Sequence, residues 1–552
     1  MSKQATESIT AQFDDWRTLR WSIYALLIAA AAASMTSRLM QVRSTSIADP
    51  SPFLSANDRS RWCTIRSLGD YGTYAIDDVI FDAKGNRQRA WHTIDLVKHR
   101  GRDGKEHYYS SKPTLLPTLL AGEYWLIKQV TGASLSNKHK TFYIARLMLL
   151  LSQVLPLTVA LWLLAAMIEK TGTSNWGRIF VVACATQGTF LSTFAVTLNN
   201  HVIAAVAIVF ALAALWPVFR DEAGDDAPKG ANDWWRFVVG GLASSFAVTC
   251  ELPALAFFAL LGVVLLAKSP LRTMVAFVPP AAVVFAAALG TNYLAHESLR
   301  PAYAHRYKDG PTLVSVSPNH ASAFDQRQLP AVAVEELETK NIELSPHTII
   351  EQRQPGERWV IWDVDGHDRL AVQVVGNERI EIRAWDDWYD YAGTYWTANR
   401  LQGVDKGEPS VSVYAFHCLF GHHGVFSLTP VWLFSMWGLF LWLRGQRDWR
   451  RWLAAAITLL SVVVICFYFS RPLIDRNYGG VTSGLRWLFW LIPLWLLALI
   501  PAADALANSR WGRVIAVIFF TISVFSANYA TLNPWSQPWL FDYWQQLGWI
   551  RY

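Results

Sequence analysis

The sequence predicts a polytopic α-helical membrane protein with a mixed α/β insert outside the membrane. Of its 552 residues, 52% are hydrophobic and 17% are charged, whereas soluble domains carry about 25% charged residues. Tryptophan, which is enriched at membrane interfaces, occurs 28 times. The third observation is a series of apolar runs, many of them close to the roughly 20 residues that cross a bilayer.

These runs predict about 11 transmembrane helices. They lie at residues 20–40, 143–168, 178–198, 202–219, 236–250, 253–267, 272–290, 425–443, 453–469, 485–505 and 513–529. The stretch 236–267 is interrupted at "CELP", where Glu251 and Pro253 stand. Because an acid and a proline both disfavour a continuous apolar helix, we expect two short helices there. One long helix is the alternative.

The basic loops decide between these alternatives. Cytoplasmic loops of membrane proteins carry an excess of Lys and Arg. With the N-terminus in the cytoplasm and two helices in 236–267, all short basic loops fall on one side; they are 169–178, 220–235, 268–271, 444–452 and 506–512. A single helix would export the loop "RGQRDWRR". The pattern therefore predicts a multi-pass protein of the inner or plasma membrane, with a cytoplasmic N-terminus and an extracytoplasmic C-terminus.

Five segments follow from this topology. They are a cytoplasmic N-terminus (1–19), an N-terminal transmembrane module (20–290) with an extracytoplasmic loop (41–142), an extracytoplasmic insert (291–424), a C-terminal transmembrane module (425–529) and an extracytoplasmic tail (530–552). Residues 114–130 carry Glu123 and Lys128, so we interpret them as an interfacial helix. Polar and apolar residues alternate around Asp-Gly and Gly-Asn pairs between residues 358 and 385, which predicts β-hairpins in the insert.

The five cysteines show no metal-binding spacing. Cys63 and Cys418 lie in polar stretches, where a disulfide between them is one alternative.

Two polar motifs lie in the first extracytoplasmic loop. "NDRSRW" follows the first span and contains Asp58, and "YYSSKPTLLP" places Lys112 directly before a proline and an apolar run. A cation at this depth can bind a lipid phosphate, and the alternative is a lysine that reaches the interface to keep its charge in water. For Asp58 the alternative is the cap of a helix that begins nearby.

These motifs resemble those of the GT-C glycosyltransferases, in particular the protein O-mannosyltransferases and the lipid A aminoarabinose transferases. Such enzymes have an acid after the first span and a Lys-Pro-Pro-Leu motif before an apolar helix; here Thr114 replaces the second proline. Three further segments resemble the family: "GLASSFAVTCELPAL" (241–255), "GHHGVFSLTPVWL" (421–433) and "NYGGVTSGLRWLFWLIP" (477–493). The resemblance does not extend to residues 291–410.

The resemblance implies a GT-C fold and transfer of a sugar from a polyprenyl-phosphate carrier to an acceptor hydroxyl outside the cytoplasm. The partners would be the lipid-linked hexose or pentose, the bilayer and an acceptor glycan, lipid or protein, with no nucleic acid. Asp58 would be the catalytic base, and Asp77 and Asp78 are alternatives. Lys112 and Arg486, followed by Tyr478 and Arg476, would bind the donor phosphate.

Other polar residues are candidates for substrate contact. These are His422, His423, Asn200 and Glu251. A turn is the alternative for Asn199, Asn200 and His201, and a pair with Arg146 is one alternative for Glu251. We expect no cofactor; a divalent metal held by His417, His422 and His423 is the alternative, although the spacing is not a standard ligand set.

Three other functions remain open at this point. A transporter or flippase is disfavoured because the predicted span interiors are nearly free of charge. A non-catalytic scaffold would not need the acid and the Lys-Pro motif. A GT-C-type glycan polymerase or ligase is the alternative enzyme.

Overall fold

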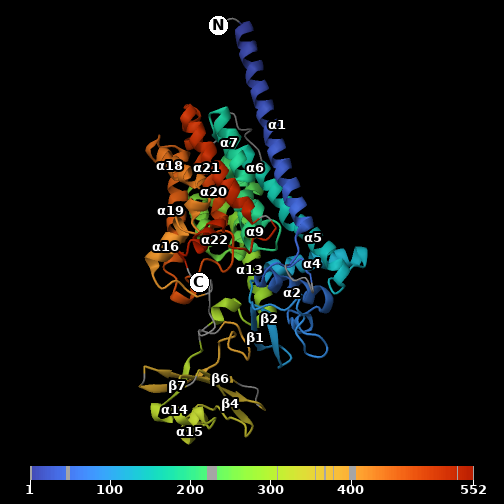
Figure 1. Cartoon of the computed structure of the whole chain (residues 1–552), viewed down its shortest axis with the longest axis vertical. Helices are drawn as coiled ribbons and strands as arrows, with labels where there is room; N and C mark the ends of the chain where they lie inside the picture. The colour runs from blue at the N-terminus through green and yellow to red at the C-terminus, as the bar shows by residue number, and fades with distance from the viewer. Residues whose placement is uncertain are drawn as a thin grey trace.

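The computed structural model covers the whole chain. It describes residues 3–44, 50–220, 233–306, 309–354, 356–365, 369–376, 378–396, 406–530 and 532–550, with only the backbone of 3–14 and 354. Apolar helices form an elongated bundle, with the N-terminus of α1 at one end of the long axis and a small sheet at the other (Figure 1).

Every apolar run of the sequence is largely helical. The helices of the bundle are α1 (Lys3–Gln41), α5 (Lys138–Leu149), α6 (Leu155–Thr171), α7 (Asn175–Gln187), α8 (Phe190–Phe194), α9 (Asn200–Phe219), α10 (Trp234–Cys250), α11 (Leu255–Lys268), α13 (Val278–His296), α18 (Val431–Arg444), α19 (Trp449–Phe469), α20 (Ile492–Ala507) and α21 (Arg510–Tyr529). Within the described residues, seven helical stretches are long and apolar enough to cross a membrane. The chain is therefore a multi-pass membrane protein, but the predicted count of about 11 spans is not confirmed.

The predicted break at "CELP" is present. Helix α10 ends at Cys250, Glu251 has extended backbone angles, and a short turn of 3-10 helix (Leu252–Ala254) leads into α11. Pro253 lacks the N–H that would continue the ladder of α10. The break turns the Glu251 side chain toward the start of α9, where it meets Asn200 and His201.

Helices α9 and α20 form the centre of the bundle. In the most apolar part of each helical stretch, 67% of the residues of 200–219 and 83% of the residues of 486–507 are buried inside the protein. Helix α20 packs against α18 and α7. Helix α9 begins at Asn200, and a 3-10 helix that begins at Arg486 leads into α20. Both residues lie at the candidate site described below.

Gly438 allows α18 to approach α20 closely. A Cβ atom at Gly438 would lie 1.9 Å from the carbonyl oxygen of Ala498. We expect Gly438→Ala to destabilise the protein by about 1–3 kcal/mol because the helices must separate, with a lower thermal midpoint in detergent. Gly262→Ala is the control, since a Cβ there meets no atom within 4 Å. Equal midpoints for the two variants would contradict the close contact.

The predicted hairpins of the insert are present. The insert holds a five-stranded antiparallel sheet in the order β3-β7-β6-β5-β4. Its strands are β3 (Thr312–Val316), β4 (Thr348–Gln354), β5 (Arg358–Asp363), β6 (Arg369–Val375) and β7 (Arg379–Ala384). Helices α14 (Ala321–Asp325) and α15 (Ala331–Glu338) supply Phe324 and Leu337 to a core shared with the sheet.

The first loop lies at the same end of the bundle as the insert (Figure 1). It contains α2 (Ala56–Tyr71), α3 (Asp77–Ile80), the hairpin β1–β2 (Leu96–Arg100 and Glu106–Ser110) and α4 (Leu115–Thr131), which packs on α2. Helix α4 matches the segment that we interpret as an interfacial helix.

All five cysteines are free. Cys63 is buried and donates its thiol hydrogen to the carbonyl oxygen of Trp91 at 3.2 Å. The alternative of a disulfide between Cys63 and Cys418 is therefore wrong.

Candidate active site

A cluster of buried charges lies where the first loop meets the ends of several bundle helices. Three cations define it: Arg61 from α2, Lys112 after β2, and Arg486 before α20. The carboxylates of Asp95 and Glu251 lie among them and favour the charged form of Arg61. We call these five residues the charge cluster.

Helix α2 positions Arg61. Ser55 caps the helix and Gly72 ends it in the left-handed conformation at φ 71°, which suits glycine because it has no Cβ. Arg61 is 3% exposed, and its guanidinium donates to the side-chain oxygens of Asn57 and Asn200 at 2.5 Å each. Burial and the nearby Arg486 lower the pKa of Arg61 to about 10. Arg61 is therefore a fixed cation that joins the first loop to the start of α9.

Lys112 pairs with Asp95 in the structure. Its Nζ lies 2.9 Å from Oδ2 of Asp95, and both side chains are largely buried. The backbone N–H of Lys112 donates to the hydroxyl of Ser110 at 3.2 Å, which fixes the chain at the end of β2. Burial lowers the pKa of Lys112, while the negative charge of Asp95 opposes that shift. In the described part of the chain, the side chain that pairs with the Asp95 carboxylate is that of Lys112.

Arg486 is held by the glycine turn before it. Gly479 has φ 95°, and its carbonyl oxygen accepts from Nε and Nη2 of Arg486 at 3.2 and 3.0 Å. The Nη1 group lies 2.7 Å from Nε2 of His201, and the guanidinium stacks over the Trp535 ring at 5.0 Å. Arg486 lies close enough to Lys112 for its charge to lower the pKa of Lys112, and the binding of a donor phosphate by both residues stays a prediction.

Glu251 and Asn200 connect the helix break to the cluster. Asn200 donates to the carboxylate of Glu251 and, at 2.8 Å, to the carbonyl oxygen of Cys250. The ring of His201 also contacts Glu251. The alternative pair of Glu251 with Arg146 is wrong, because the Arg146 guanidinium lies over the Phe142 ring instead.

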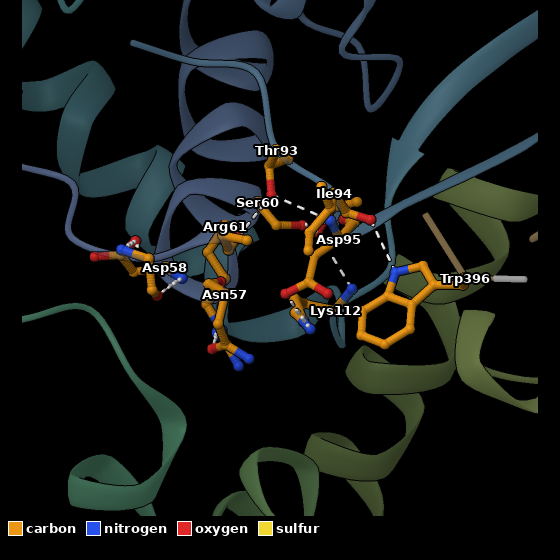
Figure 2. Close-up of polar contacts among 12 residues, drawn as sticks. Asn57, Asp58, Ser60, Arg61, Thr93, Ile94, Asp95, Lys112 and Trp396 are labelled. Atoms are coloured by element: carbon orange, nitrogen blue, oxygen red, sulfur yellow. Dashed lines mark hydrogen bonds and ion pairs between the residues drawn. The ribbon is translucent and has the colours of Figure 1, made fainter. Parts of the chain in front are cut away.

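Asp58 lies apart from the Asp95–Lys112 pair, on the other side of Asn57 and Arg61 (Figure 2). Its carboxylate accepts the backbone N–H groups of Leu54 and Ser55 at 3.0 and 2.9 Å and the Thr197 hydroxyl at 2.7 Å. Together with Ser55 it forms a capping box at the start of α2. Burial raises the pKa of Asp58 above its usual range, while these donors oppose that shift. The N-cap of α2 is therefore Ser55 rather than Asp58, which stabilises the same helix end as the partner of Ser55 in the capping box. The catalytic role of Asp58 stays a prediction.

Four of the other predicted residues have different surroundings. The Asp77 carboxylate lies 3.2 Å from His107 and accepts the backbone N–H of Tyr108, which ties α3 to β2. Asp78 is exposed. Arg476 donates to the carbonyl oxygen of Pro409 at 2.8 Å. Tyr478 packs on the ring of His423 at 5.1 Å between centroids.

His422 and His423 belong to a separate group of rings with His417 and Tyr478. The Nδ1 atoms of His422 and His423 lie 2.6 Å apart, and the rings of His417 and His422 stack at 4.1 Å. Burial lowers the pKa of His422 to about 2 and of His423 to about 3, so both rings are neutral. Within the described residues, no group of three or more His, Cys, Asp or Glu side chains is arranged to hold a metal ion.

The insert contacts the first loop next to Asp95. Nε1 of Trp396 donates to the carbonyl oxygen of Ile94 at 2.8 Å, next to Asp95 (Figure 2). Trp388 and Tyr389 of the insert pack with Val97 and Tyr109 of the β1–β2 hairpin. The insert is therefore attached to the segment that carries Asp95.

The sequence did not single out Arg61, Asp95 or Trp535 as site residues. Arg61 stands in the "NDRSRW" motif, where the acid drew attention first. Asp95 stands in "HTIDLVKH", which has no motif around it. Its position becomes significant only when the hairpin brings it opposite Lys112.

No protein-family model matches the chain, and the search of curated proteins gives no match. Solved structures do resemble it. The archaeal oligosaccharyltransferase AglB from Archaeoglobus fulgidus, in complex with an inhibitory peptide and a dolichol-phosphate, has 11% identity and a TM-score of 0.43 over 93% of this chain and 56% of that one. The S. cerevisiae protein O-mannosyltransferase Pmt1–Pmt2 complex bound to the sugar donor has 10% identity and a TM-score of 0.42 over 96% and 92%.

This chain spans little more than half the length of the archaeal oligosaccharyltransferase chains that it matches. Both kinds of neighbour belong to the GT-C superfamily, which the sequence motifs also resemble. With identities of 10 to 12% and TM-scores below 0.5, the likeness does not assign a function to this chain. The proposal below therefore depends on the charge cluster.

Proposed function

We propose that the protein is an inverting glycosyltransferase that moves a sugar from a polyprenyl-phosphate donor to an acceptor hydroxyl. The observation that carries this proposal is the gathering of Arg61, Lys112 and Arg486, which lie on three distant segments. Among the described residues, the carboxylates whose charges act on Arg61 are those of Asp95, Glu251 and Asp58, and the Asp58 oxygens are engaged by Leu54, Ser55 and Thr197. The three cations lie close enough to repel one another, since Arg486 lowers the pKa of Arg61, and both lower the pKa of Lys112. An anionic phosphate bound between them would relieve this repulsion.

The bond that breaks joins the anomeric carbon to an oxygen of the lipid phosphate. The acceptor oxygen forms a new bond to that carbon from the opposite side, and the polyprenyl phosphate leaves with the bonding electron pair. Negative charge on the phosphate grows in the transition state, so cations fixed beside it stabilise that state more than the bound donor. Arg61 and Arg486 are held in place by Asn57, Asn200, His201 and Gly479.

The acceptor hydroxyl must lose its proton to a base. Asp95 suits this role because, in the described part of the chain, the side chain that pairs with its carboxylate is that of Lys112. When the phosphate of the donor attracts Lys112, the Asp95 carboxylate becomes available. Asp58, which the sequence motif favours as the base, uses its oxygens to accept from Leu54, Ser55 and Thr197, and it is the alternative.

The distribution of basic loops determines the side of the membrane on which we place the charge cluster. The charge cluster would face the extracytoplasmic side of the inner or plasma membrane, where the prenyl tail of the donor remains in lipid. The acceptor would be a protein Ser or Thr, a lipid or a cell-envelope glycan. The insert, which is attached next to Asp95 through Trp396, would contact this acceptor.

The test is the transfer of sugar from polyprenyl-phosphate donors by purified protein in lipid. Lys112→Ala is expected to lower kcat/KM by about 10²–10³-fold, as for the loss of one charge-stabilising donor. Lys128→Ala is the control, because Lys128 belongs to the same loop and pairs with Asp70 at 2.7 Å. Equal activity of the two variants would contradict the phosphate site. A scaffold would show no transfer at all, and a flippase would move the lipid-linked sugar without cleaving it.

A further inference from the structure

A second site lies at the other end of the bundle. A cavity of about 630 Å³ opens among α9, α11 and α19, within the range of about 300–1,000 Å³ typical of small-molecule sites. Its walls are apolar side chains such as Leu212, Leu261 and Leu460, and at one end stand Lys268, Arg447 and Trp449. We call it the α11–α19 groove.

The groove is separate from the charge cluster. Helix α9 begins at Asn200 and α11 begins four residues after Glu251, while Lys268 is the last residue of α11. Helix α19 runs from Trp449 at the groove to Phe469, and Tyr468 stacks on Trp487 beside Arg486. At 1.5 Å per residue, the 21 residues of α19 place the two sites roughly 30 Å apart, close to the thickness of a bilayer core.

The groove opens to the lipid-facing side of the protein. Val263 of α11 and Leu459 of α19 both line it, and their exposed fractions are 63% and 55%. Helices α9 and α19 are among the stretches apolar enough to cross a membrane, and α11 belongs to a shorter apolar helical stretch. Exposed apolar side chains on such helices are covered by hydrocarbon. Such walls suit a lipid chain better than water.

The polar end of the groove has the chemistry of a headgroup site. Lys268 donates to the carbonyl oxygens of Val218 and Phe219 at 3.3 and 3.4 Å, which holds its ammonium at the end of α9. Arg447 is exposed in the loop before α19. Trp216 and Trp449 meet edge to face at 5.5 Å, and tryptophan favours the depth at which headgroups meet hydrocarbon.

From the apolar walls, the two cations and the tryptophans, we propose that the α11–α19 groove binds an anionic glycerophospholipid of the leaflet opposite to the charge cluster. The acyl chains lie along α11 and α19. The headgroup phosphate meets Lys268 and Arg447. Asp448 also lines the groove and caps α19; among the described lining residues, two cations therefore stand beside one carboxylate, and the net charge at this end is positive. This site does not depend on the proposed transferase activity.

Native mass spectrometry of the purified full-length chain tests the site, with phosphatidylglycerol and phosphatidylcholine of equal chain length as probes. The wild type is expected to retain phosphatidylglycerol in preference. Lys268→Gln keeps an N–H donor for the α9 carbonyls but removes the charge. That variant and Arg447→Gln are each expected to lower phosphatidylglycerol retention about fivefold, the usual contribution of one basic residue to binding anionic lipid. Arg510→Gln, at the same end of the bundle but outside the groove, is the control.

A variant that fills the groove tests the acyl-chain part. Ala456→Trp places a large ring among the lining residues and is expected to lose retention of both lipids, whereas Val517→Trp on the exposed face of α21 is expected to retain them. Equal retention of the two lipids by the wild type would overturn the headgroup assignment. Wild-type retention by Ala456→Trp would overturn the groove as the binding site. Displacement of phosphatidylglycerol from the groove by a polyprenyl phosphate would overturn the identity of the lipid.

Discussion

Asp95→Asn is expected to lower kcat for sugar transfer by about 10²–10⁴-fold, the usual contribution of a general base, without raising KM for the donor. Asparagine occupies the same volume but cannot take the proton of the acceptor. The loss of a negative charge beside Lys112 and Arg61 also leaves more positive charge for the donor phosphate. Replacing a purely structural residue would instead raise KM or lower the thermal midpoint. A fall in kcat with KM unchanged therefore identifies Asp95 as the base.

Asp58 requires its own pair of variants, because its carboxylate completes the capping box at the start of α2. Ser55→Ala removes the partner of Asp58 in the capping box and is expected to destabilise the protein by about 0.5–2 kcal/mol, with transfer retained. Asp58→Asn should lower the thermal midpoint in the same way, since its amide group cannot accept the N–H groups of both Leu54 and Ser55. If Asp58→Asn abolished transfer while Ser55→Ala and Asp95→Asn retained it, Asp58 would be the base and the assignment of Asp95 would be wrong.

The fold could be predicted from the sequence where local chemistry decides it. Pro253 and Glu251 interrupt an apolar run, so the break between α10 and α11 followed from two residues. The alternation of polar and apolar residues between 358 and 385 predicted the hairpins of the insert. The number of spans could not be predicted in the same way, because several apolar helices, such as α7 and α18, have fewer than 18 residues.

The candidate site was predictable only in part. Lys112, Arg486, Asn200 and Glu251 follow motifs or helix ends, and the structure brings them together with Arg61. Asp95 carries no local signal, since its position depends on a hairpin that pairs Leu96 with Ser110. Conversely, His422, His423 and Tyr478 lie in motifs that resemble the same family, but their rings pack on one another. Sequence spacing does not reveal which face of a short segment meets the charge cluster.

Arg486→Ala is expected to lower kcat/KM by about 10²–10³-fold, because the variant loses a fixed cation beside the leaving phosphate. The guanidinium is held by two hydrogen bonds to the Gly479 carbonyl oxygen and by its contact with His201. It therefore needs little reorganisation as charge develops. Arg486→Lys keeps the charge but cannot form the same planar contacts, so we expect an intermediate loss of activity.

Arg471→Ala is the matched control for Arg486. Arg471 belongs to the same loop, is 40% exposed in its side chain and pairs with Asp475 at 2.6 Å; exposed pairs of this kind contribute about 0–1 kcal/mol to stability. Inhibition by free polyprenyl phosphate, the leaving group of the reaction, provides a second measurement. If Arg486 binds the phosphate, Arg486→Ala weakens this inhibition and Arg471→Ala does not. Unchanged inhibition in Arg486→Ala would place the phosphate elsewhere, and the three gathered cations would then serve only to hold the first loop against the bundle.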